Sequence, residues 1–254
     1  MSGDDSLEII LRSLGLHVVL REFAQAIAQA ERENWGYRRF LHYLAQCEVA
    51  ERVSHKVKRL LDQAKIPAEF TLAALEQHKL GEKPRRLLPT LLSGDFVRRG
   101  DNLLCFGLPG RGKSAYVAAI ARHLVQQYQM KVLFVPTFKL VSELLVAKAK
   151  LALPRLLERL HKFDVICCDD IGYVQHSAEE MEVLFTFLAE RYQRNKSIAL
   201  TSNIVFSEWD RIFKNPMTAM AAVDRLVHRS VILEFIRDKS YREEMAEQQA
   251  PLNR

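Results

Sequence analysis

The sequence has little of what marks several large classes of protein. Its 254 residues include only 4 cysteines, 10 glycines and 8 prolines, which excludes a disulfide-rich, collagenous or low-complexity chain. No apolar run approaches the roughly 18 residues of a membrane-spanning helix, and the first five residues are acidic where a secretory signal is basic. We therefore expect a soluble cytoplasmic protein with reduced cysteines and no membrane partner.

Charge is only weakly biased. Lys and Arg total 37 against 31 Asp and Glu, a net charge of +6 that does not by itself indicate nucleic-acid binding. The surplus is concentrated in two windows, Lys79 to Arg99 and Lys139 to Lys162, each with six basic and two acidic residues. Hydrophobic residues make up 48% of the chain, enough to bury a sizeable core.

The sequence predicts two domains. Apolar residues recur at helical spacing from residue 6 to about 64 without strand-like alternation, which predicts a small all-helical domain over residues 1–66. Residues 67–99 contain Pro, Gly and charged residues typical of a connecting segment, and we interpret them as a linker. Residues 100–254 then form the second domain.

Beyond residue 100, short apolar runs alternate with amphipathic stretches, which predicts an α/β domain around a parallel sheet. The expected strands are 102–106, 131–135, 165–168, 198–201 and 231–235. The expected helices lie near 113–127, 138–149, 154–162, 177–193 and 217–228.

The segment after the first predicted strand has the pattern of a phosphate-binding turn. GLPGRGKS matches G-x-x-x-x-G-K-[ST] and stands between a strand and a helix. Glycines let backbone N–H groups converge on phosphate, Lys113 reaches the terminal phosphates, and the Ser114 hydroxyl coordinates Mg²⁺. We therefore expect ATP and Mg²⁺ as cofactors. The predicted binding residues are Gly107, Pro109, Gly110, Gly112, Lys113 and Ser114.

Polar residues follow two other predicted strands. Asp169 and Asp170 come directly after the third strand, so the sheet presents both at its carboxyl edge, beside the nucleotide. We expect Asp169 to hold Mg²⁺ through a water molecule and Asp170 to orient or deprotonate the attacking water. The fourth strand leads into Ser202-Asn203, where an amide is placed to hold that water or the γ-phosphate, although Ser-Asn also forms simple turns.

Taken in order, these motifs resemble one family. The stretches that carry the resemblance are GLPGRGKS, DVICCDDIGY, SIALTSN, AVDRLVHRS and KSYR. They are similar to those of the IstB-like ATPases, helper proteins of a bacterial insertion-sequence family and kin of DnaC-type helicase loaders in the AAA+ superfamily. The helical run from Leu11 to Phe23 is similar too, so the resemblance covers nearly the whole chain.

The resemblance implies an α/β AAA+ P-loop core with a parallel five-stranded sheet of order 5-1-4-3-2. It also implies a homo-oligomer with ATP at the subunit interfaces. By position, Asn203 matches the first sensor, Arg225 the arginine finger that reaches a neighbour's ATP, and Arg242 a second sensor. Asp170 stands where many AAA+ proteins have Glu, so we expect Mg²⁺-dependent hydrolysis that is slow.

The basic window from Lys139 to Lys162 falls on the helices after the second strand, where initiator-type AAA+ proteins face DNA. This implies contacts from Lys148 and Lys150 to duplex DNA phosphates that do not depend on base sequence. A solvated helix face is the alternative. The resemblance gives the helical domain a role in assembly and in docking a transposase, although aromatic residues at helical spacing are also typical of a core.

The implied function is that of an ATP-dependent transposition helper, which oligomerises on duplex DNA and recruits or activates a transposase. Two alternatives keep the fold: a loader of the replicative helicase, and a nucleotide-gated DNA clamp with little hydrolysis. A third is a small-molecule kinase. The pair Asp169-Asp170 together with Asn203 favours water as the phosphoryl acceptor, and hence an ATPase.

Overall fold

The computed structural model describes residues 3–76, 80–173, 177–204 and 226–235. The chain divides into two compact units, Met1–Arg59 and Leu60–Arg254. Among the described residues, no helix is long and apolar enough to cross a membrane.

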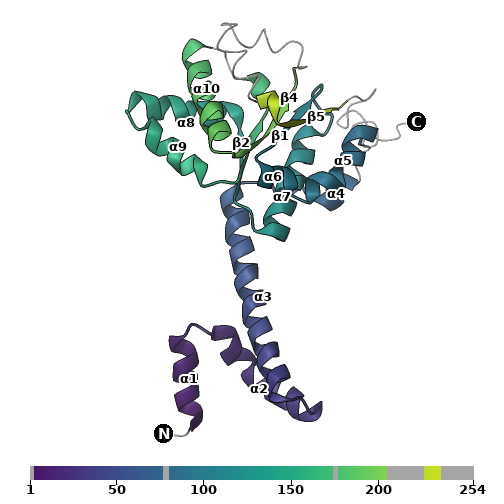
Figure 1. Cartoon of the computed structure of the whole chain (residues 1–254), viewed down its shortest axis with the longest axis vertical. Helices are drawn as coiled ribbons and strands as arrows, with labels where there is room; N and C mark the ends of the chain where they lie inside the picture. Colours follow the sequence, from purple (N-terminus) through teal and green to yellow (C-terminus); the bar gives the residue numbers. More distant parts are fainter. Residues whose placement is uncertain (1–2, 77–79, 174–176, 205–225, 236–254) are drawn as a thin grey trace, which may run out of the picture. The chain divides into compact units, whose positions relative to one another are not determined.

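All the regular secondary structure described in the first unit is helical, as the apolar spacing predicted. It contains α1 (Gly3–Ser13), α2 (His17–Arg32) and most of α3 (Tyr37–Ala64) (Figure 1). Each helix contributes to a small core, which contains Leu11 of α1, Val19 and Ala26 of α2, and Leu44 of α3.

A buried carboxylate joins α3 to the start of α2. No side chain at the N-cap of α2 bonds its first turn. Instead, Glu48 Oε2 accepts hydrogen bonds from the N–H groups of Val18 at 3.0 Å and Val19 at 3.3 Å, and Oε1 accepts one from Arg52 Nε at 2.8 Å. Burial alone would raise the pKa of the Glu48 carboxyl. The three donors outweigh that effect and hold the pKa below its usual range.

The second unit is built on a parallel sheet of order β2-β3-β4-β1-β5, the order that the family resemblance implied. Its strands are β1 (Asn102–Phe106), β2 (Val132–Pro136), β3 (Val165–Asp169), β4 (Ser197–Ser202) and β5 (Ser230–Glu234). Every predicted strand end lies within one residue of the observed one. In the register, Leu103 of β1 lies opposite Ala199 of β4 and Val231 of β5.

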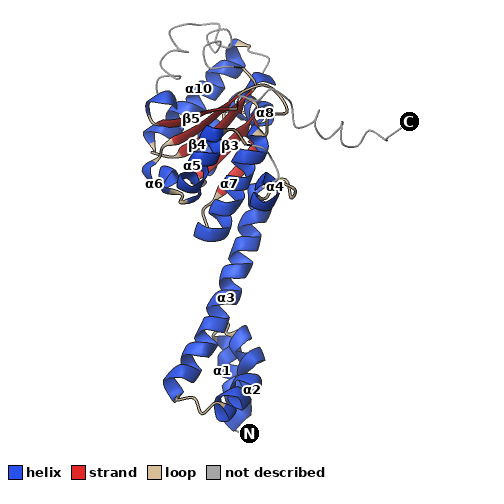
Figure 2. Cartoon of the chain, turned by 90° about the vertical axis from the view of Figure 1, so that its right-hand side faces the viewer, coloured by secondary structure: helices blue, strands red, loops and turns tan. Residues whose placement is uncertain are grey.

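Helices cover both faces of this sheet (Figure 2). They are α4 (Leu72–Glu76), α5 (Glu82–Leu92), α6 (Asp95–Arg99), α7 (Lys113–Tyr128), α8 (Thr137–Ala149), α9 (Leu153–His161), the short η1 (Ile171–Tyr173) and α10 (Ala178–Gln193). One core joins the sheet to α8, α9 and α10, and the other joins it to α4 through α7. Of the predicted helix 217–228, residues 217–225 lie outside the described residues and 226–228 are helical.

The segment 67–99, predicted as a linker, differs from that expectation because it belongs to the second unit. Helices α4, α5 and α6 occupy most of it, and Leu91 and Phe96 are buried in the core beside α7. The two glycines that suggested a connecting segment stand at helix starts instead, with Gly81 as the N-cap of α5 and Gly94, at φ 74°, as the N-cap of α6. The boundary between units lies earlier, after Arg59.

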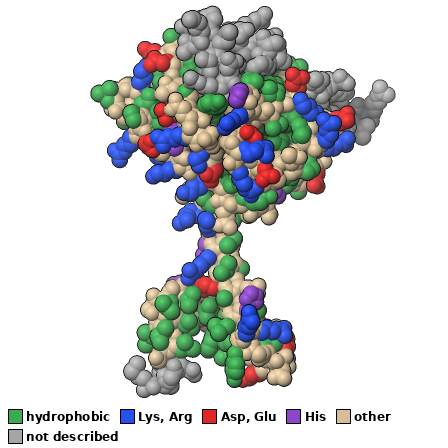
Figure 3. Space-filling view, in the orientation of Figure 1, with side chains coloured by type: hydrophobic (Ala, Val, Ile, Leu, Met, Phe, Trp, Pro, Cys, Tyr) green, Lys and Arg blue, Asp and Glu red, His purple; other side chains and the backbone are tan. Residues whose placement is uncertain are grey.

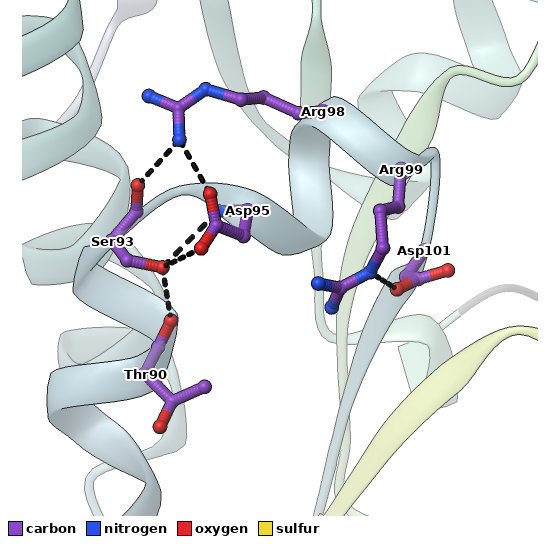
Figure 4. Close-up of polar contacts among 6 residues, drawn as sticks. All are labelled: Thr90, Ser93, Asp95, Arg98, Arg99 and Asp101. Atoms are coloured by element: carbon purple, nitrogen blue, oxygen red, sulfur yellow. Dashed lines mark hydrogen bonds and ion pairs between the residues drawn. The ribbon is translucent and has the colours of Figure 1, made fainter.

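Polar contacts fix the corner that leads from α5 into β1 (Figure 4). Arg98 Nη1 donates to Asp95 Oδ1 at 2.6 Å and to the carbonyl oxygen of Ser93 at 3.0 Å. Arg99 Nε donates to Asp101 Oδ2 at 2.7 Å, just before the strand begins. Exposed ion pairs of this kind contribute little to stability. Their role is local, since they set the direction in which the chain enters β1.

Candidate nucleotide site

The turn between β1 and α7 has the backbone that phosphate binding requires. Gly107, Gly110 and Gly112 have φ values of 142°, 75° and 86°, a region that favours glycine. A Cβ on Gly107 would lie 2.7 Å from the carbonyl oxygen of Phe235, so the turn passes too close to the end of β5 for a larger residue. Gly112 is the N-cap of α7 and has no side chain to cover the first N–H groups, which leaves them open to an anion.

Lys113, the first residue of α7, folds its side chain back over this turn. Its Nζ donates to the carbonyl oxygens of Gly107 at 2.6 Å and Leu108 at 2.9 Å, and the residue is only 7% exposed. Burial lowers the pKa of Lys113, an effect that the carboxylates of Asp170 and Asp169 oppose. The ammonium group is therefore held inside the turn, where phosphate oxygens would replace the carbonyls.

Two threonines fix the acidic pair at the end of β3. Thr201 Oγ1 of β4 donates to Asp169 Oδ1 at 2.7 Å and accepts the backbone N–H of Asp170 at 2.8 Å. Thr137 Oγ1 of α8 donates to the backbone carbonyl oxygen of Asp169 at 2.9 Å. Asp170 itself adopts a left-handed backbone with φ 53°. The pair is thus held from two neighbouring elements.

The acidic pair and the phosphate turn interact electrostatically. Burial raises the pKa of Asp170, and the proximity of Asp169 adds to that effect. The N–H of Gly172, which donates to Asp170 Oδ1 at 3.3 Å, and the ammonium of Lys113 lower it without cancelling the rise. The sheet edge therefore brings one cation and two carboxylates within reach of each other.

Asn203 lies at the same edge, just beyond β4. Its amide packs directly against Gly172, because a Cβ on that glycine would sit 2.0 Å from Asn203 Oδ1. The Oδ1 atom is buried and accepts no hydrogen bond from the described part of the chain. A buried amide oxygen without a partner is costly, and such atoms are found at functional sites.

The structure thus assembles Lys113, Asp169, Asp170 and Asn203 at the carboxyl edge, with Ser114 following as the second residue of α7. Their chemical roles stay predictions. Arg225 and Arg242, predicted as the arginine finger and second sensor, lie outside the described residues.

Sequence reasoning missed the two threonines that hold the acidic pair. A threonine in a strand or at a helix start is read as a β-former or a helix-start residue, and neither pattern indicates a link to a carboxylate. The one signal available was the position of Thr201 at the polar end of a strand, two residues before Asn203.

The two lysines predicted to contact DNA differ in their surroundings. Lys148 Nζ lies 2.6 Å from Glu182 Oε2 of α10, so its charge already has a partner. Lys150 lines an open groove between α8 and α9 and forms no ion pair with a described residue. The other charged residues that line the groove are Arg155, Arg159, Lys162, Glu143 and Glu158.

Comparisons with known sequences agree with this arrangement. The family described as IstB-like ATP binding protein matches residues 9–249. An insertion-sequence ATP-binding protein of Sinorhizobium fredii is 38% identical over 241 residues, which cover 94% of this chain and 80% of the relative. An ATP-binding protein of the insertion sequence IS21 from Pseudomonas aeruginosa is 33% identical over 239 residues. These residues cover 93% of this chain and 88% of the relative.

Two solved structures are similar in fold over about two thirds of this chain. DnaI superposes with a TM-score of 0.57 at 21% identity, covering 68% of this chain and 95% of that chain. The DnaC helicase loader has a TM-score of 0.56 at 19% identity. The match covers 67% of this chain and 100% of that chain. These structures therefore support the parallel-sheet fold that the family resemblance implied. With a family match that spans nearly its whole length, the chain belongs to the IstB-like ATP-binding proteins.

Proposed function

We propose that this chain is an ATP-dependent helper of DNA transposition, which oligomerises on duplex DNA and recruits or activates a transposase. The observation that carries the proposal is the buried Lys113 in a glycine turn at the same sheet edge as Asp169 and Asp170. Membership of the family, and relatives described as ATP-binding proteins of insertion sequences, support the transposition context.

In this proposal the turn and Lys113 bind the phosphates of ATP. Ser114 and Asp169 would hold Mg²⁺, and the structure fits that role, because Asp169 Oδ2 accepts no hydrogen bond from the described residues while Oδ1 is bonded to Thr201. When bound, Mg²⁺ neutralises charge on the phosphates. Asp170 orients or deprotonates the water, and Asn203 holds the water or the γ-phosphate.

Hydrolysis is expected to be slow and to need a neighbouring subunit. Asp170 is one methylene shorter than the Glu of many AAA+ proteins, so it reaches the water less well. We assign Arg225 as the finger that completes the adjacent subunit's site, an interaction that typically contributes about 10³- to 10⁵-fold in rate. Arg242 would contact the nucleotide as a second sensor.

The groove between α8 and α9 is the proposed site of contact with duplex DNA. Lys150 lines it together with other basic residues, and such contacts depend on phosphate charge and not on base sequence. Lys148 would have to leave its ion pair with Glu182 to reach a phosphate. We therefore expect Lys150 to contribute more than Lys148.

For the helical unit we propose docking of the transposase and support of assembly. Hydrophobic side chains are visible over this unit in the space-filling view (Figure 3). Ile9 and Ile10 of α1, Leu14 just after α1, and Leu41 and Val49 of α3 are all exposed. Clusters of exposed apolar residues on a folded unit are typical of protein interaction sites.

The deciding experiment is electron microscopy of the protein with ATP and duplex DNA, combined with an ATPase assay. Nucleotide-dependent oligomers on DNA are expected, and failure to bind ATP or DNA would overturn the proposal. The likeness in fold to DnaC and DnaI favours a helicase loader as the second candidate. Pull-downs against a transposase and against the replicative helicase separate the two.

A further inference from the structure

We propose that Thr201 is a positioning residue for ATP hydrolysis, whose single hydroxyl sets the placement of both Asp169 and Asp170. The inference rests on the proposed ATPase function of this site. Thr201 is 1% exposed and belongs to β4, whereas Asp169 is the last residue of β3 and Asp170 follows it. The hydroxyl therefore links two strands at the edge where ATP would bind.

One hydroxyl group makes two different hydrogen bonds. As a donor, Thr201 Oγ1 reaches Asp169 Oδ1 at 2.7 Å, and as an acceptor it receives the backbone N–H of Asp170 at 2.8 Å. A hydroxyl has one hydrogen to donate and lone pairs to accept, so both bonds form at once. Because threonine is β-branched, its χ1 angle is stiff, and the oxygen stays where the strand places it.

The bond to Asp169 determines which of its oxygens is available. With Oδ1 accepting from Thr201, the carboxylate is fixed in rotation and Oδ2 is left without a donor among the described residues. That oxygen is the one free for a cation. Partners of this kind behind a metal-binding carboxylate typically affect metal affinity or activity by about 10- to 100-fold when removed.

The hydrogen bond to the N–H of Asp170 stabilises an unfavourable backbone conformation at that residue. Asp170 has φ 53°, and a non-glycine residue in a sparsely populated region costs on the order of 1 kcal/mol and persists only where its surroundings hold it. The hydrogen bond from its N–H to Thr201 is one such restraint, and the bond from the Gly172 N–H to Asp170 Oδ1 is another. Together they fix the direction in which the Asp170 carboxylate leaves the backbone.

The test compares variants that keep or remove the hydroxyl in the full-length protein. Thr201→Val removes it at nearly constant volume, Thr201→Ser keeps it, and Thr201→Ala is a second variant without it. Thr186→Val is the matched control, because among the described residues the Thr186 hydroxyl bonds only the Glu182 carbonyl oxygen of its own helix, at 2.8 Å.

We expect Thr201→Val to lower kcat, measured at saturating ATP and Mg²⁺, by about 10- to 100-fold. Thr201→Ser should stay near wild type, as should the control. A second readout is the rise in melting temperature that ATP causes. It is measured once in the presence of Mg²⁺ and once with a chelator instead of Mg²⁺. Thr201→Val should keep the stabilisation by ATP alone and lose most of the additional stabilisation by Mg²⁺.

Wild-type kcat in Thr201→Val, or an equal loss in Thr201→Ser, would overturn the inference. So would failure of both hydroxyl-free variants to fold, because the hydroxyl would then be a requirement of folding. Failure of the proposed function looks different: the wild-type protein would not hydrolyse ATP, or Lys113→Ala would hydrolyse it equally well.

Discussion

The Nζ of Lys113 lies 2.6 Å from the backbone carbonyl oxygen of Gly107, within the turn that Lys113 itself closes. A buried ammonium is expensive to desolvate, and here backbone carbonyls satisfy it while two carboxylates stand nearby. The arrangement keeps a cation inside the turn, where the sequence predicts the terminal phosphates of a nucleotide. It suits an anionic ligand far better than an apolar one.

The first prediction is that Lys113→Ala abolishes ATP binding. A charge-assisted hydrogen bond is worth roughly 3 kcal/mol at the upper end of its range, so the affinity should fall by about 100-fold or more. Titration with a fluorescent ATP analogue measures it. Lys131→Ala, at an exposed position, is the control and should bind as wild type. Unchanged affinity in a folded Lys113→Ala protein would remove the nucleotide-site assignment.

The second prediction separates hydrolysis from binding. Asp170→Asn keeps the shape of the side chain but loses the carboxylate that positions the water, so turnover should fall by about 100-fold or more while ATP binding persists. The variant should accumulate the ATP-dependent assembly on DNA. Asp101→Asn, whose carboxylate bonds Arg99 on the surface, is the matched control. Full ATPase activity in Asp170→Asn would move the catalytic role to another residue.

The third prediction uses the contact between Gly172 and Asn203. A methyl group at residue 172 would sit 2.0 Å from Asn203 Oδ1, so Gly172→Ala must displace that amide. If Asn203 holds the water or the γ-phosphate, kcat should fall by about tenfold or more. Gly36→Ala, where a Cβ meets nothing within 4 Å, is the control. An active Gly172→Ala protein would show that the position of Asn203 does not matter to turnover.

The sheet could be predicted closely because its signal is local. Strands β1, β3 and β4 are buried on both faces, so each reads as a continuous apolar run, and their ends came out within one residue. The sheet order was not local information, since it came from the resemblance of the motifs to a known family. The phosphate turn was readable because glycine, lysine and serine each have a specific task there.

Residues 67–99 show where local reasoning fails. Pro84 falls in the first turn of α5, where its missing N–H costs nothing, yet in the sequence it reads as a helix breaker. Leu91 and Phe96 are buried by contacts with distant residues of α7, which no local pattern reveals. The link from Thr201 to Asp169 is likewise a contact between residues 32 positions apart in sequence.

The fourth prediction concerns the basic groove. Replacing Lys148 and Lys150 together by Ala should weaken binding to every duplex sequence alike and flatten the dependence of log affinity on log salt by up to roughly two units. Because Lys148 is paired with Glu182, Lys150→Ala should account for most of the change. Lys131→Ala again serves as the control. Losses confined to particular base sequences, or an unaltered salt slope, would leave these lysines as part of a solvated face.

The last prediction concerns the stability of the helical unit and follows from Glu48. Its carboxylate bonds the N–H groups of Val18 and Val19 at the start of α2, which has no side-chain cap of its own. Glu48→Gln keeps the size of the side chain but removes the charge. By analogy with the loss of a helix cap, α2 should lose about 1 to 2 kcal/mol of local stability at neutral pH.

The sign of the pH dependence follows from the lowered pKa of Glu48 in the folded protein. The unfolded chain takes up a proton near the ordinary Glu value of about 4.3, so the stabilisation is fully present above that pH. It is lost as pH falls through the lower folded pKa. The difference between wild type and Glu48→Gln should therefore be constant from neutral pH to about 5 and should shrink in more acidic solution.

Hydrogen exchange at the amides of Val18 and Val19 measures the local stability of the start of α2. Wild type and Glu48→Gln are compared at each pH. Glu51→Gln is the matched control, because Glu51 lies on the same helix and pairs with Arg21 at 3.7 Å without touching the start of α2. Faster exchange in Glu48→Gln but not in Glu51→Gln is the expected result. Equal protection in all three proteins at neutral pH would show that the carboxylate satisfies these N–H groups no better than an amide oxygen does.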